Sequence, residues 1–263
     1  MQDASQQRAK GSPIYLLPSM ITISSMCCGF YAMVESISGD FYHAGIAIVF
    51  SMILDTLDGR IARLTKTSSS FGAELDSLAD MVAFGAAPAM IAFNWGLHHF
   101  GRLGWLVAFV YCACGALRLA RFNVMIGSGD KKYFQGMPIP TAAALVVGFV
   151  YLCAEYNQSS KFMFMVGLFI TLIVALSMVS NIKFYSFKEF HFHQTARFRA
   201  LLLFLAVLVL LFNYPEEVSY GFFVIYAIAS YICWILRIGY GKKDTDEHSD
   251  SVSSVNTISE DAN

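Results

Sequence analysis

Residues 55–80 read "DTLDGRIARLTKTSSSFGAELDSLAD", a polar stretch that joins two strongly apolar segments of the chain. Its four aspartates, at positions 55, 58, 76 and 80, border or lie inside segments that have the composition of membrane spans. Ionisable side chains at membrane depth are costly and usually serve a function. The polar residues TKTSSS in the middle predict a turn, so the two apolar segments are expected to form a helical hairpin.

The composition of the whole chain indicates an integral membrane protein. Of its 263 residues, 56% are hydrophobic and only 14% are charged, and the mean hydropathy is +0.54. Soluble globular proteins carry about 25% charged residues. These proportions exclude an ordinary soluble domain, and we expect one helical bundle embedded in a membrane.

Eight segments are apolar enough to cross a bilayer, which takes about 20 residues as a helix. Because lipid cannot satisfy free backbone groups, we expect uninterrupted helices and an all-α polytopic fold of about eight transmembrane helices. The second segment is short unless its helix continues to about residue 64. The eight segments are residues 14–35, 41–57, 75–95, 103–120, 138–155, 161–182, 198–213 and 218–238.

The distribution of basic residues predicts the orientation. If the N-terminus is cytoplasmic, 16 of the 18 Lys and Arg residues fall in cytoplasmic segments, and only Arg102 and Lys161 fall outside. This division follows the positive-inside rule. We therefore expect a protein of the inner (cytoplasmic) membrane with both termini and the aspartate stretch on the cytoplasmic side. A polar segment (1–13), a transmembrane domain (14–240) and an acidic, disordered tail (241–263) would make up the chain.

The spacing of the aspartates predicts a metal site. Asp55 and Asp58 are three residues apart and Asp76 and Asp80 are four apart, so each pair shares a helix face. Four close carboxylates repel one another unless cations lie between them. Mg²⁺ or Mn²⁺ fits such oxygen ligands, and two ions would suit a displacement at phosphorus. The simpler alternative is that these are helix-end carboxylates paired with nearby basic side chains, namely Arg60, Arg63 and Lys66.

The stretch resembles the signature of the CDP-alcohol phosphotransferase family, D-x2-D-G-x2-A-R-x8-G-x3-D-x3-D, and fits it at every fixed position. The resemblance implies that all four aspartates bind metal and that Asp80 is also the general base. It further implies that the alkoxide of an acceptor alcohol attacks the β-phosphorus of a CDP-linked lipid and that CMP leaves. The residues expected to bind the nucleotide and diphosphate are Thr22, Gly59, Ala62, Arg63 and Gly72.

Three further segments, at 71–89, 115–124 and 134–144, resemble the integral-membrane phosphatidylserine synthase branch of this family. That resemblance implies CDP-diacylglycerol and L-serine as substrates, and a homodimer. The first span departs from the branch, because Ser19 and Ser25 stand where relatives often have Asn. Contact between this span and the cytidine is therefore expected to depend on Thr22.

Serine as the acceptor also has support from the charged residues. Its carboxylate needs a cation, and Arg118, Arg121 and Asn123 end the fourth span on the predicted cytoplasmic side. An arginine can hold a carboxylate through two parallel hydrogen bonds. Ordinary positive-inside anchoring, or binding of lipid phosphate, would explain the same arginines. Other acceptors (glycerol 3-phosphate, inositol phosphate or choline) and a divalent-metal transporter are the alternative functions.

Overall fold

The computed structural model describes residues 16–65, 69–125, 134–180, 183–184 and 215–235. Three predicted segments lie wholly outside these residues: the polar N-terminal segment 1–13, the seventh candidate span 198–213 and the acidic tail 241–263. Lys66, one of the basic residues that could pair with the aspartates, also lies outside them.

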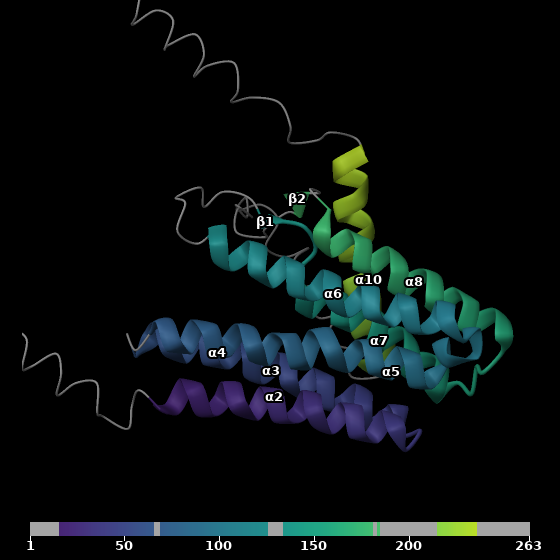
Figure 1. The fold of residues 1–263 in the computed structure, drawn as a ribbon, viewed down its shortest axis with the longest axis horizontal. Coiled ribbons are helices and arrows are strands. Elements are labelled where there is room, and N and C mark those ends of the chain that lie inside the picture. The colour runs from purple at the N-terminus through teal and green to yellow at the C-terminus, as the bar shows by residue number, and fades with distance from the viewer. Residues whose placement is uncertain (1–15, 66–68, 126–133, 181–182, 185–214, 236–263) are drawn as a thin grey trace, which may run out of the picture. The chain divides into compact units, whose positions relative to one another are not determined.

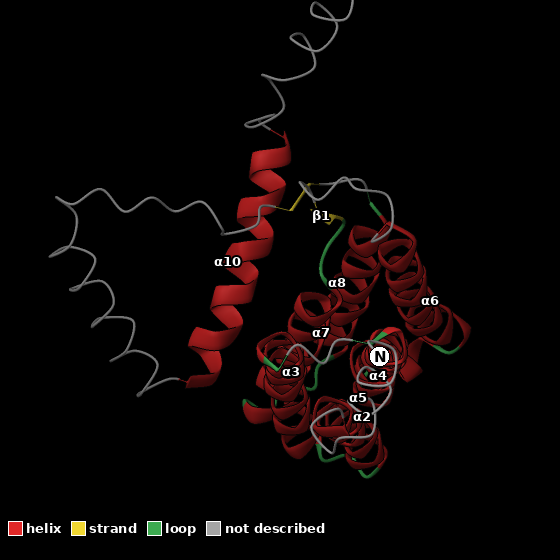
Figure 2. Cartoon of the chain, turned by 90° about the vertical axis from the view of Figure 1, so that its left-hand side faces the viewer, coloured by secondary structure: helices red, strands yellow, loops and turns green. Residues whose placement is uncertain are grey.

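The described chain is almost entirely helical. It divides into two compact units, Met1–Val224 and Ile225–Asn263. Figure 2 shows α2 to α8 of the first unit nearly end-on, side by side as a bundle. In chain order the elements are α2 (Leu16–Ile37), α3 (Phe41–Leu64), α4 (Ser70–Asp80), η2 (Met81–Ala86), α5 (Ala87–Trp95), η3 (Leu97–Phe100), α6 (Arg102–Met125), β1 (Phe134–Gln135), α7 (Ile139–Glu155), α8 (Lys161–Val179), β2 (Lys183–Phe184) and α10 (Pro215–Ile235).

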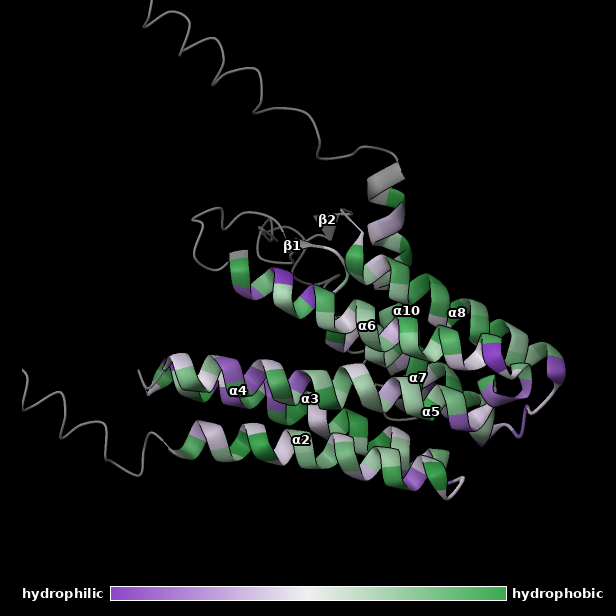
Figure 3. Cartoon of the chain, viewed as in Figure 1, coloured by the Kyte–Doolittle hydropathy of each residue, from purple (hydrophilic) through white to green (hydrophobic). Residues whose placement is uncertain are grey.

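Four stretches of described helix are long and apolar enough to cross a membrane: 17–37, 70–95, 102–124 and 161–179. Figure 3 shows the apolar residues along most of their length. The second expected span continues as a helix to Leu64, the length it needs to reach beyond a bilayer. The helix at 139–155 is apolar but has only 17 residues.

The hairpin predicted at the aspartate stretch is formed by α3 and α4, which run antiparallel (Figure 1). Helix α3 ends at Leu64, with Thr65 as its C-cap. Helix α4 begins after Ser69, whose hydroxyl accepts a hydrogen bond from the Gly72 amide at 3.0 Å, as an N-cap serine does.

Helix α2 packs against both arms of this hairpin and makes its most extensive contact with α3. Ser25 and Ser51 join α2 and α3 at a buried point. Each hydroxyl lies 3.0 Å from the other residue's backbone carbonyl, to which it can donate its single proton, and the two hydroxyl oxygens lie 2.8 Å apart. Both hydroxyls thus have acceptors away from water, which ties α2 to α3 at this point.

Residues 70–95 stay helical, as predicted, but not as an uninterrupted α-helix. A π-turn, η2, separates α4 from α5, and the Ala87 amide bonds five residues back to the Val82 carbonyl. The cause is Pro88, which has no N–H for the Phe84 carbonyl four residues earlier and whose ring would clash with it. Widening the helix before the proline relieves that clash.

The chain after α6 and the chain after α8 meet in a two-residue antiparallel ladder between β1 and β2. Gly136 follows β1 with a φ of +86°, and a Cβ there would lie 2.3 Å from the Met178 carbonyl oxygen. Only glycine satisfies both constraints. The Met137 amide then donates to the Ser177 carbonyl at 3.2 Å, which ties the start of α7 to the end of α8.

Candidate active site

Three of the four aspartates form one cluster. Asp55 on α3 and Asp76 and Asp80 on α4 each offer a carboxylate oxygen, and these oxygens all lie within 4.8 Å of one another. All three side chains are half-buried. The antiparallel hairpin produces this cluster because it brings the last turns of α3 alongside α4 (Figure 1), so that Asp55 meets Asp76 and Asp80.

Asp58 lies beside this cluster and has a different partner. Its Oδ2 accepts a hydrogen bond from the Thr22 hydroxyl on α2 at 2.6 Å, and both side chains are 5% exposed. Residues three apart on a helix share a face but differ by about 60° around its axis, which lets Asp55 and Asp58 lean toward different neighbours. Asp58 turns toward α2, whereas Asp55 turns toward the aspartates of α4, including Asp80.

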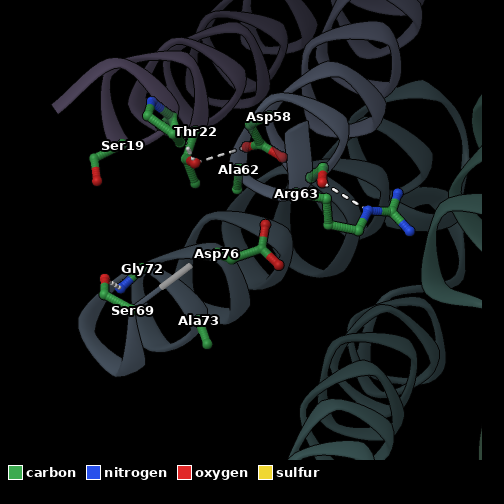
Figure 4. Close-up of a pocket in the computed structure, with 11 residues that line it drawn as sticks. Ser19, Thr22, Asp58, Ala62, Arg63, Ser69, Gly72, Ala73 and Asp76 are labelled. Carbon is green, nitrogen blue, oxygen red and sulfur yellow. Dashed lines mark hydrogen bonds between the residues drawn. The ribbon is translucent and has the colours of Figure 1, made fainter. Parts of the chain in front are cut away.

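A pocket of about 220 Å³ opens next to the aspartates, between α2, the end of α3 and the start of α4 (Figure 4). Asp58 and Asp76 both line it, so it borders on the carboxylate cluster. All five residues expected to bind the nucleotide and diphosphate also line it. The eleven lining residues are Pro18, Ser19, Thr22, Asp58, Gly59, Ala62, Arg63, Ser69, Gly72, Ala73 and Asp76.

Several of these lining residues leave room for a ligand. A Cβ at Gly59 would meet nothing within 4 Å, so the backbone of α3 is open to close approach there. Gly72 lies in the first turn of α4, where the amide groups of a helix N-terminus favour a negative charge. Ser69 also lines the pocket, and its N-cap position three residues before Gly72 is the signal that could have added it to the predicted site.

The basic residues of the hairpin do not neutralise the aspartates directly. Arg63 donates its Nε–H to the Gly59 carbonyl in its own helix at 2.9 Å, and Arg60 is exposed. In the described part of the chain, no Lys or Arg forms a salt bridge with any of the four aspartates. Arg60 and Arg63 therefore do not form the helix-end ion pairs that the alternative interpretation required.

Arg118 brings a positive charge close enough to the cluster to act on one of its aspartates. It comes from α6, is partly buried, and interacts electrostatically with Asp80. Its guanidinium carbon lies 5.5 Å from the centre of the Phe122 ring, a cation–π distance. Arg121 lies further along the same helix and is also partly buried. Neither arginine is among the residues that line the pocket.

Asn123 makes a contact that the sequence reasoning missed. Its amide Nδ2 donates to the Ser77 hydroxyl on α4 at 3.0 Å, and its Oδ1 lies 3.4 Å from the same hydroxyl. Ser77 follows Asp76 directly, so this bond links α6 to the part of α4 that carries the cluster. The polar side chain of Ser77, next to Asp76, was the available signal, and Asn123 was instead expected to face the acceptor.

The donor set of this site suits a hard divalent cation. Three carboxylate oxygens converge, a fourth carboxylate adjoins them, and the charge of Arg118 is too small to offset all four. Oxygen ligands of this kind are those that Mg²⁺ and Mn²⁺ prefer. The adjoining pocket, with its helix N-terminus and Arg63, suits a phosphate-bearing ligand.

Comparison with known proteins gives consistent results. The sequence profile described as CDP-alcohol phosphatidyltransferase matches residues 15–179. The chain is 40% identical to the CDP-diacylglycerol–serine O-phosphatidyltransferase of Helicobacter pylori strain 26695 over 240 residues, covering 88% of this chain and 97% of the relative. It is 42% identical to the Methanocaldococcus jannaschii protein of the same name over 137 residues, covering 52% of this chain and 61% of that one.

A solved structure shares the fold at low sequence identity. It is the crystal structure of Mycobacterium tuberculosis phosphatidylinositol phosphate synthase in apo form, which matches 68% of this chain and 91% of its own. The TM-score is 0.50 and the identity is 16%. This likeness concerns the arrangement of helices alone.

Proposed function

The chain belongs to the CDP-alcohol phosphatidyltransferase family, and from this premise we propose that it transfers the phosphatidyl group of CDP-diacylglycerol to the hydroxyl of L-serine. The products are phosphatidylserine and CMP. The observation that carries the proposal is the similarity to relatives named for this reaction, which extends over nearly the whole length of both chains. The carboxylate cluster beside a pocket supplies the matching chemistry.

The proposed mechanism assigns each aspartate a role. Asp55, Asp58, Asp76 and Asp80 would hold divalent cations, Mg²⁺ or Mn²⁺ and two of them by family resemblance. Such ions neutralise the diphosphate and the charge that develops during transfer. Asp80 takes the proton from the serine hydroxyl. The serine oxygen then forms a bond to the β-phosphorus of CDP-diacylglycerol, the bond from that phosphorus to the bridging oxygen breaks, and CMP departs with that oxygen.

The pocket is the proposed site of the cytidine and its diphosphate. Gly59 and Ala62 leave space along α3, and Gly72 offers the first turn of α4 to a phosphate. Arg63 adds a positive charge at the same rim. The Thr22 hydroxyl already donates to Asp58, so its contribution to nucleotide binding would pass through that carboxylate.

Arg118 has the strongest support among the residues proposed to bind serine. It lies within electrostatic reach of Asp80, the proposed base, so a carboxylate held by its guanidinium would leave the serine hydroxyl near that base. Arg121, one turn further along α6, remains a second candidate. The amide of Asn123 is engaged with Ser77, which favours a supporting role for it over direct contact with the acceptor.

The arrangement in the membrane is also proposed. Six of the eight expected spans coincide with helices between α2 and α8, and the eighth coincides with α10. The charge distribution supports cytoplasmic termini and an active site on the cytoplasmic face of the inner membrane. A homodimer is implied by the family resemblance alone, and chemical cross-linking in membranes would test it.

The function is tested with purified protein, CDP-diacylglycerol, Mn²⁺ and radiolabelled L-serine. We expect a labelled phospholipid and one CMP for each lipid formed, and no product after chelation of the metal. Parallel reactions with glycerol 3-phosphate, inositol phosphate and choline test the acceptor. A labelled lipid from one of these, and none from serine, would refute the serine assignment while leaving the family chemistry intact.

A further inference from the structure

The π-turn η2 lies directly after Asp80 and has one feature that the reaction does not account for. Pro88 leaves the Phe84 carbonyl without its α-helical donor. The hydroxyl of Tyr111, on α6, donates a hydrogen bond to that carbonyl at 3.2 Å. Phe84 and Tyr111 are both 0% exposed. A buried carbonyl needs a partner, and this tyrosine supplies one from another helix.

The π-turn is also packed closely on its other sides. A Cβ at Gly29 of α2 would lie 2.5 Å from the Cα of Ala83, so α2 touches the backbone of the turn itself. On the α6 side, a Cβ at Gly115 would lie 3.7 Å from the Cα of Gly85. Tyr111 and Gly115 are one turn apart on α6, so one face of α6 holds the turn by a hydrogen bond and by close packing.

The turn determines which way the aspartates face. One extra residue in a helical turn rotates the preceding part of a helix relative to the following part by about 100°. Helix α5 is buried on most of its surface, including Ile91 and Trp95, so its orientation is set by packing. Without the extra residue, and with α5 held in place, Asp76 and Asp80 would rotate away from Asp55.

We propose that Tyr111 is a positioning residue for the metal centre: its hydroxyl holds the π-turn at Phe84 and thereby keeps Asp76 and Asp80 directed at Asp55. Tyr111 is not one of the residues that line the pocket, and its hydroxyl donates to the Phe84 carbonyl, so its effect passes through the backbone of the turn. The inference rests on the proposed function only in taking the carboxylate cluster as a metal site.

The test compares Mn²⁺ binding by full-length wild-type protein and Tyr111→Phe, using the electron paramagnetic resonance signal of free Mn²⁺. The substitution removes one oxygen and keeps the ring. We expect about a tenfold weaker affinity for Mn²⁺, since the bond lost is buried. Transfer activity is expected to need correspondingly more Mn²⁺ and to recover at saturation.

Tyr220→Phe is the matched control, because among the described residues its hydroxyl has no hydrogen-bond partner. The Mn²⁺ affinity of this variant should equal that of the wild type.

Pro88→Ala distinguishes two possible roles of the Tyr111 hydroxyl: holding the π-turn in place, or only giving the Phe84 carbonyl a hydrogen-bond donor. It restores an N–H four residues after Phe84, so it would rescue Tyr111→Phe if the hydroxyl only satisfied that carbonyl. If the hydroxyl holds the turn, the double variant binds Mn²⁺ no better than Tyr111→Phe, because an ordinary α-helical turn misdirects the aspartates. Rescue by Pro88→Ala, or wild-type Mn²⁺ affinity in Tyr111→Phe, would overturn the proposal.

Two further measurements keep the outcomes distinct. Gly29→Ala displaces the same turn from α2 and is expected to weaken Mn²⁺ binding too. Wild-type Mn²⁺ affinity in this variant would overturn the premise that the turn directs the aspartates, even if Tyr111→Phe is not recovered folded. Phosphatidylserine synthesis by the wild type is measured in parallel. Wild-type protein that binds Mn²⁺ but makes no phosphatidylserine would refute the proposed function, while the comparison between variants would still decide the role of Tyr111.

Discussion

Replacing Thr22 by valine tests how the first helix contributes to the site. The change removes the hydroxyl, whose single proton has two acceptors within reach, Asp58 Oδ2 at 2.6 Å and the Pro18 carbonyl at 3.0 Å, and it preserves the shape of the side chain. The bond to Asp58 is the shorter of the two, and its acceptor is a carboxylate. Two roles are open for this hydroxyl: it could orient Asp58 for metal binding, or it could contact the cytidine directly.

The structure supports the first role and sets the size of the effect. A hydrogen bond to a charged group contributes about 1.5–3 kcal/mol. Because Thr22 and Asp58 are each only 5% exposed, water cannot easily replace the hydroxyl. A loss of about 2 kcal/mol corresponds to about a 30-fold change in an equilibrium constant. We therefore expect Thr22→Val to raise the Mn²⁺ concentration for half-maximal activity by about 30-fold.

The assay is radiolabelled serine incorporation over a range of Mn²⁺ concentrations, followed by a CDP-diacylglycerol titration at saturating Mn²⁺. The KM for the lipid should then change little. Thr22→Ser retains the hydroxyl and is expected to stay close to the wild type in both titrations. A raised KM for CDP-diacylglycerol with an unchanged Mn²⁺ dependence would refute this reasoning and assign the hydroxyl to the nucleotide.

Three other substitutions test separate parts of the structure. Asp80→Asn should lower transfer at least about 100-fold while CDP-diacylglycerol still binds, as measured by labelled lipid retention, and near-normal turnover would contradict its role as base. Arg118→Lys keeps the charge but loses the planar fork, so the KM for serine should rise about tenfold, whereas the control Arg102→Lys at the other end of α6 should not change it. Gly136→Ala combines a positive φ with a clash on the Met178 carbonyl and should lower the melting temperature more than Gly39→Ala, where φ is +82° and the surroundings are open. Equal melting temperatures for those two variants would show that the clash is relieved at no cost.

Much of the fold could be predicted from apolar length and charge. The hairpin at residues 55–80 follows from one polar turn between two apolar runs, and α3 extends to Leu64, the length that the short second span required. Periodicity carries no information about small changes in helical register, so the π-turn was missed. Pro88 was the available signal, but a proline in a membrane helix can produce a kink, a break or a wider turn, and only packing decides which.

The candidate site shows a similar division between what spacing predicts and what it does not. The four aspartates could be identified because their residue types and intervals fit a family signature, and three of them do converge. The position of Asp58 depends on Thr22, which lies 36 residues earlier in the sequence. Asn123 likewise has its partner Ser77 46 residues away. Such pairs arise from the way helices meet, and no local pattern in a single sequence records them.

Three polar side chains around the cluster form hydrogen bonds to a neighbouring helix. Thr22 holds Asp58, Asn123 holds Ser77, and Tyr111 holds the backbone after Asp80. The first two bonds join α2 and α6 to the helices that carry the aspartates, and the third joins α6 to the π-turn that follows Asp80. Four carboxylates with no direct salt bridge among the described residues would separate if the helices were free to move. The hydroxyls and the amide oppose that separation, so the protein can keep the carboxylates together before a cation binds and lose less free energy to rearrangement when it does.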